Sequence, residues 1–276
     1  MRKQIIEILR EIEIMENIKV MYACESGSRA WGFDSKDSDH DIRFIYTRPM
    51  SSYFSISPLR DVIDRNKGNI MTSAYIRKLE EQEIDVVGFD ISKAIKMIAD
   101  GNPALAEWLH SPIVYIEKLF VTAALQRLSE RFFKSKAGIY HYEHMARKNF
   151  TQYIKNVDED VIIKKYLYVL RPLYACEYII MTNGGVPPMD FNKLIELSID
   201  YVTKGFDTIH GAVKNLVARK KAGEELGRAP HIDLLDDFCS KALKSYSGYA
   251  ETLGVVKLTE EEYSSLDSAF FDIVCK

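Results

Sequence analysis

The sequence has no long hydrophobic run. Nowhere do about 18 consecutive apolar residues occur, the length that a membrane-spanning helix needs. The first 17 residues carry acidic side chains at positions 7, 11, 13 and 16, and these interrupt any signal-peptide core. We therefore expect a soluble, cytoplasmic protein with no membrane partner.

Cysteine is scarce and scattered. The four cysteines are Cys24, Cys176, Cys239 and Cys275, and no two of them form a CxxC pair. This spacing argues against a zinc knuckle and against a disulfide framework. Reduced cysteines in a cytoplasm are the simplest interpretation.

The sequence also lacks an excess of either charge. It has 37 basic and 40 acidic residues, a net charge of −3. Such a balance excludes a general attraction to nucleic acid or anionic lipid, so any polyanion site must be local. With 276 residues, of which 47% are hydrophobic, the chain is long enough to bury a core of one large or two ordinary domains.

Apolar spacing divides the chain into two parts. Helical spacing over residues 3–16 is followed by β-prone segments, which we expect to be strands, at 18–23, 41–47, 61–63 and 84–89. Helical spacing resumes after Ser92, which we expect to be an N-cap, and Pro103 suits a first helical turn. Beyond residue 112 the pattern is helical at 115–134, 136–156, 159–182, 207–222, 231–253 and 259–274. We predict an α+β part, residues 1–112, and an all-helical part, residues 113–276.

The densest cluster of polar residues is CESGSRAWGFDSKDSDHDIRFIY, residues 24–46. Asp39 and Asp41 have the same strand parity, so both carboxylates point to one face while His40 points to the other. Two such carboxylates repel each other unless a cation lies between them. Mg²⁺ (or Mn²⁺) suits this position, because it binds one or two carboxylates together with water and substrate phosphates.

A glycine and a serine precede this pair of carboxylates. Gly27 and Ser28 follow a predicted strand, and Asp39 comes eleven positions after Ser28. A glycine turn before a helix presents backbone N–H groups that can bind a phosphate. A solvated acidic loop with no function is the other interpretation of the cluster.

A site for two metal ions that also activates a nucleophile needs a third carboxylate. Asp85 and Asp90 both lie on the predicted strand near residues 84–89, and Asp90 also stands two residues before the expected cap Ser92. The residues alone do not decide whether Asp85 or Asp90 is the third carboxylate. Arg43 shares the strand parity of Asp39 and Asp41 and can pair with them.

These motifs resemble the DNA polymerase β-like nucleotidyltransferase superfamily. GSRAWGF, DSDHDIRFIY, DVVGFDISKA and GNPALAEWLHSP in particular resemble predicted nucleotidyltransferases of the RNA-repair-pathway DNA polymerase β family. The resemblance implies a catalytic domain with a mixed sheet flanked by helices, residues 1–112, followed by a helical bundle, residues 113–276. It favours Asp85 over Asp90.

The resemblance also implies roles for particular residues. Gly27 and Ser28 would hold the phosphates, and Asp39, Asp41 and Asp85 would be the catalytic and metal-binding carboxylates. Further candidates for nucleotide contacts are Arg29, Arg43, Lys164, Tyr168 and Arg171, the last three of which share one face of a predicted helix.

We therefore expect a metal-dependent nucleotidyltransferase. It would move a nucleoside monophosphate from an NTP to an acceptor hydroxyl and release pyrophosphate. The acceptor stays open: an RNA or DNA 3′ end, a protein hydroxyl and a small molecule all fit the composition. The alternative is a catalytically silent protein that binds nucleotide or regulates a partner. Residues 48–83, the preferred NTP and the oligomeric state are not assigned.

Overall fold

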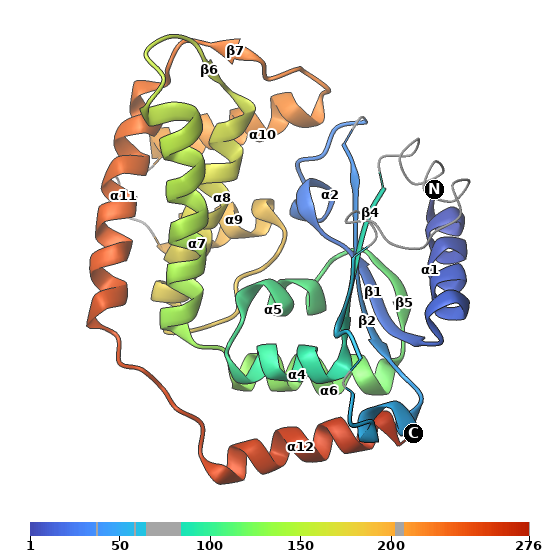
Figure 1. Ribbon diagram of the computed structural model, residues 1–276. Coiled ribbons are helices and arrows are strands. Elements are labelled where there is room, and N and C mark those ends of the chain that lie inside the picture. Colours follow the sequence, from blue (N-terminus) through green and yellow to red (C-terminus); the bar gives the residue numbers. More distant parts are fainter. Residues whose placement is uncertain (37, 58, 65–83, 202–206, 276) are drawn as a thin grey trace. The chain divides into compact units, whose positions relative to one another are not determined.

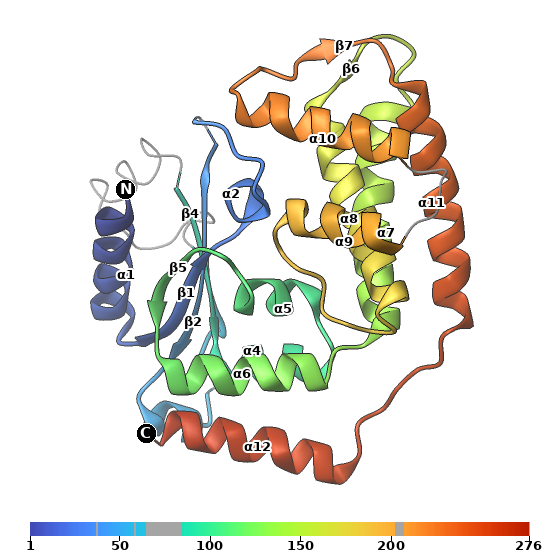
Figure 2. The same cartoon turned by 180° about the vertical axis from the view of Figure 1, so that it is seen from behind.

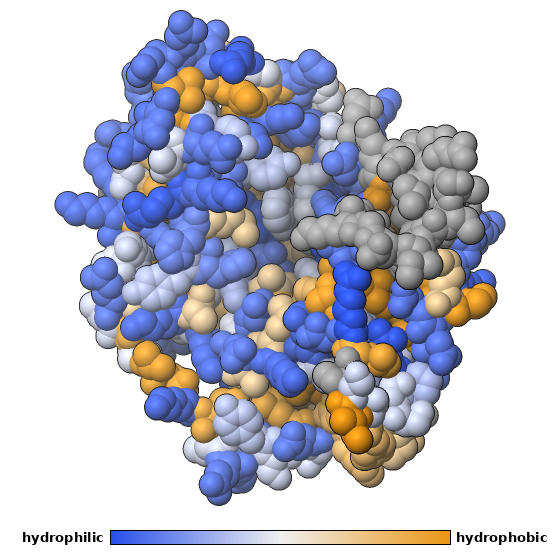
Figure 3. Space-filling view, viewed as in Figure 1, coloured by the Kyte–Doolittle hydropathy of each residue, from blue (hydrophilic) through white to orange (hydrophobic). Residues whose placement is uncertain are grey.

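The computed structural model describes residues 1–36, 38–57, 59–64, 84–201 and 207–275 (Figure 1). Contacts group the chain into two compact units. The sheet unit comprises Met1–Ala30, Asp39–Phe132 and Lys257–Lys276, and the helical unit comprises Trp31–Ser38 and Phe133–Val256. Within the described residues, every helix is too short or too polar to span a membrane. The face seen in Figure 3 is mainly polar, with apolar side chains in separate patches.

A mixed sheet forms the centre of the sheet unit, and its described strands have the order β3-β4-β2-β1-β5. The strands are β1 (Lys19–Glu25), β2 (His40–Thr47), β3 (Val62–Asp64), β4 (Ile84–Asp90) and β5 (Val114–Glu117). β2 and β4 run parallel, and the other neighbours are antiparallel. The four predicted strands are confirmed to within two residues. β5 corrects the prediction, because three of its four residues lie in the helix that was expected over residues 115–134.

Helices cover both faces of this sheet (Figures 1 and 2). One face packs against α1 (Arg2–Glu16), whose buried residues are Ile5, Ile8, Leu9 and Ile12, as the helical spacing predicted. The other face packs against α4 (Ile91–Ala99), α5 (Pro103–Leu109), α6 (Leu119–Arg131) and α12 (Glu260–Val274). The continuous apolar run of β1 follows from this arrangement, because a central strand covered on both faces has no solvent side.

Asp90, rather than Ser92, is the N-cap of α4. Its carboxylate accepts hydrogen bonds from the Ser92 N–H at 2.8 Å and the Ser92 hydroxyl at 2.6 Å. The Tyr53 hydroxyl donates to its other oxygen at 3.1 Å. Asp90 is buried, so these contacts account for its carboxylate as a helix cap.

The helical unit confirms the helical character of the second part of the chain. Its elements are α7 (Ser135–Phe150), the π-helical turn η2 (Thr151–Lys155), α8 (Lys164–Met181), α9 (Phe191–Tyr201), α10 (Asp207–Lys221) and α11 (Asp233–Thr252). A small antiparallel ribbon of β6 (Val161–Ile162) and β7 (Arg228–Ala229) also belongs to it. Neither α9 nor the ribbon was expected from the sequence.

Residues 31–38 belong to the helical unit although they lie between the first two strands. Phe33 is fully buried and makes edge contacts with the rings of Tyr168 and Phe191. Asn192 donates to the carbonyl of Gly32 at 3.4 Å. The GSRAWGF motif therefore starts in one unit and ends in the core of the other.

The contacts also differ from the predicted boundary at residue 112. Residues 113–132 and 257–276 pack in the sheet unit, and residues 31–38 pack in the helical unit. The sheet unit recruits α12 because Leu266 and Ile273 join the apolar cluster of α4, α5 and α6. A helical sequence pattern alone does not tell which core a helix will join.

Candidate active site

The chain turns sharply after β1, at Gly27. This residue has a φ of +59°, in the left-handed region that other residues adopt only at a cost. A Cβ atom here would lie 1.9 Å from Oδ2 of Asp41. The Ser26 N–H also donates to the Asp41 carbonyl at 2.8 Å. The turn needs glycine for its backbone angle and for the closeness of the Asp41 carboxylate.

Two predicted carboxylates are neighbours in the sheet. Asp41 on β2 and Asp85 on β4 are direct partners in the parallel register. The Arg43 guanidinium lies between them, with Nη2 3.3 Å from Oδ1 of Asp41 and 3.0 Å from Oδ2 of Asp85. The predicted pairing of Arg43 is thus present, and a cationic group already bridges the two carboxylates.

The negative charge on Asp41 is disfavoured where it lies. Partial burial raises the pKa of the Asp41 carboxyl, and the nearby Arg43 guanidinium opposes that rise. The carboxylates of Asp85, Glu25 and Asp39 add to the rise. The site therefore concentrates negative charge that a second cation would stabilise.

We expect Arg43→Gln to lower the stability of the metal-free protein by about 1–2 kcal/mol, because the repulsion between Asp41 and Asp85 is then unopposed. Thermal unfolding in EDTA would measure this loss. Millimolar Mg²⁺ should restore most of it in the variant. An unchanged melting temperature in EDTA would show that Arg43 does not stabilise the pair.

The third predicted carboxylate, Asp39, is exposed and directly precedes β2. Its backbone carbonyl accepts a hydrogen bond from Nε of Arg29 at 3.2 Å, so Arg29 supports the entry into β2. Ser28 is partly exposed on the first turn of α2 (Gly27–Trp31). All these residues lie within the sheet unit.

Whether these carboxylates can bind a divalent ion depends on how many of them surround one position. Among the described residues, no three His, Cys, Asp or Glu side chains are arranged around a common metal position. Asp41 and Asp85 nevertheless have a guanidinium nitrogen within 3.3 Å of both. Mg²⁺ sites that bind substrate phosphates commonly use only one or two protein carboxylates. The residues present therefore fit a magnesium site built on Asp41 and Asp85.

The structure separates the two candidates for the third carboxylate. Asp85 lies beside Asp41 at the start of β4, whereas Asp90 stands at the other end of that strand and caps α4. The capping contacts satisfy both oxygens of Asp90. The geometry therefore places Asp85, and not Asp90, with the other residues of the candidate site.

Sequence reasoning missed Glu25, the last residue of β1. Its side chain is 1% exposed, and its Oε1 accepts a hydrogen bond from the Asp41 N–H at 2.6 Å. Its Oε2 contacts Nδ1 of His40 at 2.8 Å and accepts a hydrogen bond from the Tyr115 hydroxyl. The available signal was an acidic residue directly after the apolar residues 20–24 of the strand.

Three predicted nucleotide contacts lie in the helical unit, on α8. Arg171 is fully buried, donates twice to the carbonyl of Met189 and stacks over the ring of Trp31 at 4.6 Å. Tyr168 packs edge-on against Trp31. Lys164 is exposed at the helix start. These contacts explain Tyr168 and Arg171 as core residues of this unit.

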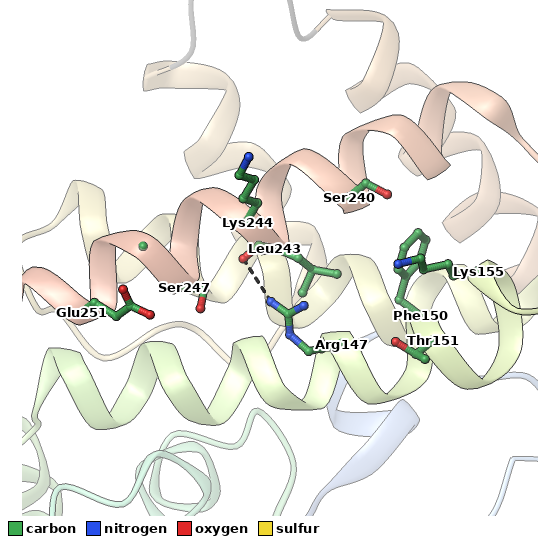
Figure 4. A pocket seen from close by; sticks show the side chains of 10 residues that line it. Arg147, Phe150, Thr151, Lys155, Ser240, Leu243, Lys244, Ser247 and Glu251 are labelled. Carbon is green, nitrogen blue, oxygen red and sulfur yellow. Dashed lines mark hydrogen bonds between the residues drawn. The ribbon is translucent and has the colours of Figure 1, made fainter.

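The helical unit also contains a hollow of about 380 Å³ between α7 and α11 (Figure 4). Its lining includes the cations Arg147, Lys155 and Lys244 and the carboxylate of Glu251. Arg147 is paired with the buried Glu143 and donates to the Leu243 carbonyl at the edge of the hollow. None of the residues that line it is among those predicted from the sequence.

Comparisons with known proteins identify a bacterial relative and a solved structure. The uncharacterized protein YcgL of Bacillus subtilis (strain 168) is 38% identical over 258 residues, and the match covers 93% of this chain and 91% of YcgL. A crystal structure of a nucleotidyltransferase-like protein from Exiguobacterium sibiricum 255-15 matches with 11% identity and a TM-score of 0.29, over 98% of this chain and 79% of that one.

The family comparison covers nearly the whole chain. Residues 1–272 match the RNA repair pathway DNA polymerase beta family. The match includes the Gly27 turn, both neighbouring carboxylates and all described helices of the helical unit. The chain therefore belongs to the RNA repair pathway DNA polymerase beta family.

Proposed function

We propose that this protein is a Mg²⁺-dependent nucleotidyltransferase that moves a nucleoside monophosphate from an NTP to an acceptor hydroxyl. The hydroxyl oxygen forms a bond to the α-phosphorus, and the bond from that phosphorus to the pyrophosphate oxygen breaks. The acceptor proton leaves to a carboxylate, and pyrophosphate is released. Positioning and charge neutralisation account for most of the catalysis in reactions of this kind.

The observation that supports this proposal is the direct contact between the glycine turn and the carboxylate pair. A Cβ on Gly27 would overlap the Asp41 carboxylate, whose strand neighbour is Asp85. A phosphate held by the N–H groups of the turn would therefore stand beside two carboxylates. Such a phosphate and such carboxylates repel each other unless a cation joins them, which explains why these elements belong in one site.

Each residue then has a distinct task. Asp41 and Asp85 would hold the Mg²⁺, with Asp39 next to them at the entry of β2. Bound there, Mg²⁺ would neutralise phosphate charge. Asp85 would accept the proton of the attacking hydroxyl, and the Ser28 hydroxyl would donate to a phosphate oxygen. Arg43 would leave the carboxylates and turn toward the phosphates when the nucleotide arrives.

The experiment is a transfer assay with NTPs labelled on the α- or the γ-phosphate, offered with RNA, protein and small-molecule fractions as acceptors. We expect label from the α-phosphate alone on one acceptor class, Mg²⁺ dependence, and loss of at least a hundredfold in rate for Asp85→Asn. Full activity in Asp85→Asn would contradict the assigned site. The labelled fraction would identify the acceptor, which is an RNA or DNA end, a protein or a small molecule.

One observation favours a second candidate, a silent nucleotide-binding or partner-regulating protein. The Arg43 guanidinium already satisfies the carboxylates that a metal would need. In this case calorimetry would detect nucleotide binding while the transfer assay finds no labelled product. Binding that is indifferent to Mg²⁺ would favour this second candidate further.

A further inference from the structure

We propose that Glu25 is a positioning residue of the nucleotidyl-transfer site, which holds Asp41 in place and adds negative charge behind it. The inference rests on the proposed function. Glu25 contacts the backbone N–H of Asp41 and is almost fully buried, so it would act through Asp41 and not on a substrate directly. Its place is the last residue of β1, two positions before Gly27.

The backbone of Asp41 shows why a positioning residue is needed. The pairing of β1 with β2 ends at Glu25 and Ile42, so Asp41 lies one residue beyond the last backbone pair. The Glu25 side chain continues the ladder by accepting from the Asp41 N–H at 2.6 Å. The Ser26 N–H donates to the carbonyl of the same residue at 2.8 Å. Both backbone groups of Asp41 on this side are thus held by the two residues before the glycine turn.

Every polar atom of Glu25 has a partner that holds it in place. Its N–H donates to the Ile113 carbonyl at 2.9 Å, and its carbonyl accepts from the Ser111 hydroxyl at 2.6 Å. The two carboxylate oxygens contact Asp41, His40 and Tyr115. A side chain held in this way has one orientation. Its hydrogen bond therefore also restricts the position of Asp41.

The hydrogen bond to Asp41 does not require Glu25 to be negatively charged. A neutral amide oxygen would also accept from the Asp41 N–H, whereas a buried carboxylate next to Asp41 adds repulsion. Repulsion of this kind favours a cation at the site. Hydrogen-bond partners that orient metal ligands typically change the affinity for the metal by about 10–100-fold, and Glu25 would orient Asp41 through its backbone N–H.

The test compares wild type with Glu25→Gln, which keeps the side-chain shape and an acceptor oxygen but removes the charge. Tyr115→Phe is the matched variant that removes one partner of Glu25 and keeps the carboxylate. Glu7→Gln, on the exposed face of α1, controls for the loss of one negative charge elsewhere. Each protein is first checked by thermal unfolding in EDTA, and only folded variants are carried further.

Two measurements follow. Calorimetry with Mn²⁺ alone should give an affinity about 10–100-fold weaker in Glu25→Gln, and within threefold of wild type in Tyr115→Phe and Glu7→Gln. Amide exchange in metal-free protein, followed by NMR, should be about tenfold faster at the Asp41 N–H in Glu25→Gln, because a charged acceptor makes the stronger hydrogen bond. Equal Mn²⁺ affinity and equal Asp41 exchange in wild type and Glu25→Gln would overturn the inference.

The two readouts separate this inference from the proposed function. If wild type binds no Mn²⁺, the metal-dependent function fails, and the exchange of the Asp41 amide alone decides the role of Glu25. Faster exchange in Glu25→Gln then supports positioning, and equal exchange refutes it. If wild type transfers nucleotide, Glu25→Gln should lower kcat and leave the KM for NTP within threefold of wild type. This result would support the positioning role further, since Glu25 contacts Asp41 and not the glycine turn.

Discussion

Asp41→Asn should strongly reduce nucleotidyl transfer and at the same time stabilise the metal-free protein. Loss of a metal-binding carboxylate removes several kcal/mol of transition-state stabilisation, so we expect the rate to fall by about a thousandfold. Stability should rise because the charge on Asp41 is partly buried and close to other carboxylates. The measurements are initial rates with saturating Mg²⁺ and NTP, and thermal unfolding in EDTA.

The pH dependence of this stability gain has a definite sign. The folded-state pKa of Asp41 is raised, chiefly by burial. Asp41 therefore stabilises the fold below its unfolded-state pKa, near 4, and this contribution is lost as the pH rises through the folded-state pKa. The stability advantage of Asp41→Asn should be small at low pH, should grow through that window, and should then stay constant.

Asp39→Asn is the comparison variant, because Asp39 is exposed and its charge has little effect on the free energy of unfolding. We expect an unchanged melting temperature in EDTA for this variant, whatever its activity. An Asp41→Asn protein that keeps full transfer activity would refute the role of Asp41. Equal stability of Asp41→Asn and wild type at neutral pH would refute the electrostatic argument separately.

Gly27→Ala should have the second largest effect. The new Cβ would need to occupy space 1.9 Å from Oδ2 of Asp41, at a residue with φ of +59°. The backbone angle alone costs about 1–2 kcal/mol, and the carboxylate must move as well. We expect a lower melting temperature, and a loss of Mg²⁺-dependent activity of at least a hundredfold even where the protein stays folded.

Gly211→Ala provides the control for Gly27→Ala. Gly211 lies inside α10, and a Cβ there would meet nothing within 4 Å. Alanine is the better helix former by about 1 kcal/mol, so this variant should be as stable as wild type or more stable. Near-normal stability and activity in Gly27→Ala would show that the glycine turn can relax. It would contradict the argument that the turn needs glycine next to the Asp41 carboxylate.

The parts of the site that sequence predicts are those set by local rules. Gly27 and Ser28 were recognisable because they directly follow a predicted strand and Asp39 comes eleven positions after Ser28. The parity of a strand placed Arg43 on the same face as Asp41, and their ion pair is present. Asp85 was separated from Asp90 by family resemblance, and the parallel register then placed it beside Asp41.

The parts that sequence did not predict depend on contacts between distant segments. Glu25 meets Tyr115, which is 90 residues further along the chain, and no local pattern signals that pair. Helical spacing placed Tyr168 and Arg171 on one face, but it does not distinguish a solvent-facing surface from a core that buries a guanidinium over Trp31. Residues 65–83, part of the unassigned stretch 48–83, lie outside the described residues.

The position of α12 has a consequence for synthesis on the ribosome. Leu266 and Ile273 complete the apolar cluster of α4, α5 and α6, yet α12 follows the whole helical unit in the chain. At about 5–20 residues per second, translation of residues 133–256 delays α12 by roughly 6–25 s. The sheet unit, which begins first, is thus finished last, and during this delay its nascent core exposes the surface that α12 will cover. Ribosome-bound chains ending before residue 257 should therefore bind chaperones more strongly than full-length chains released from the ribosome.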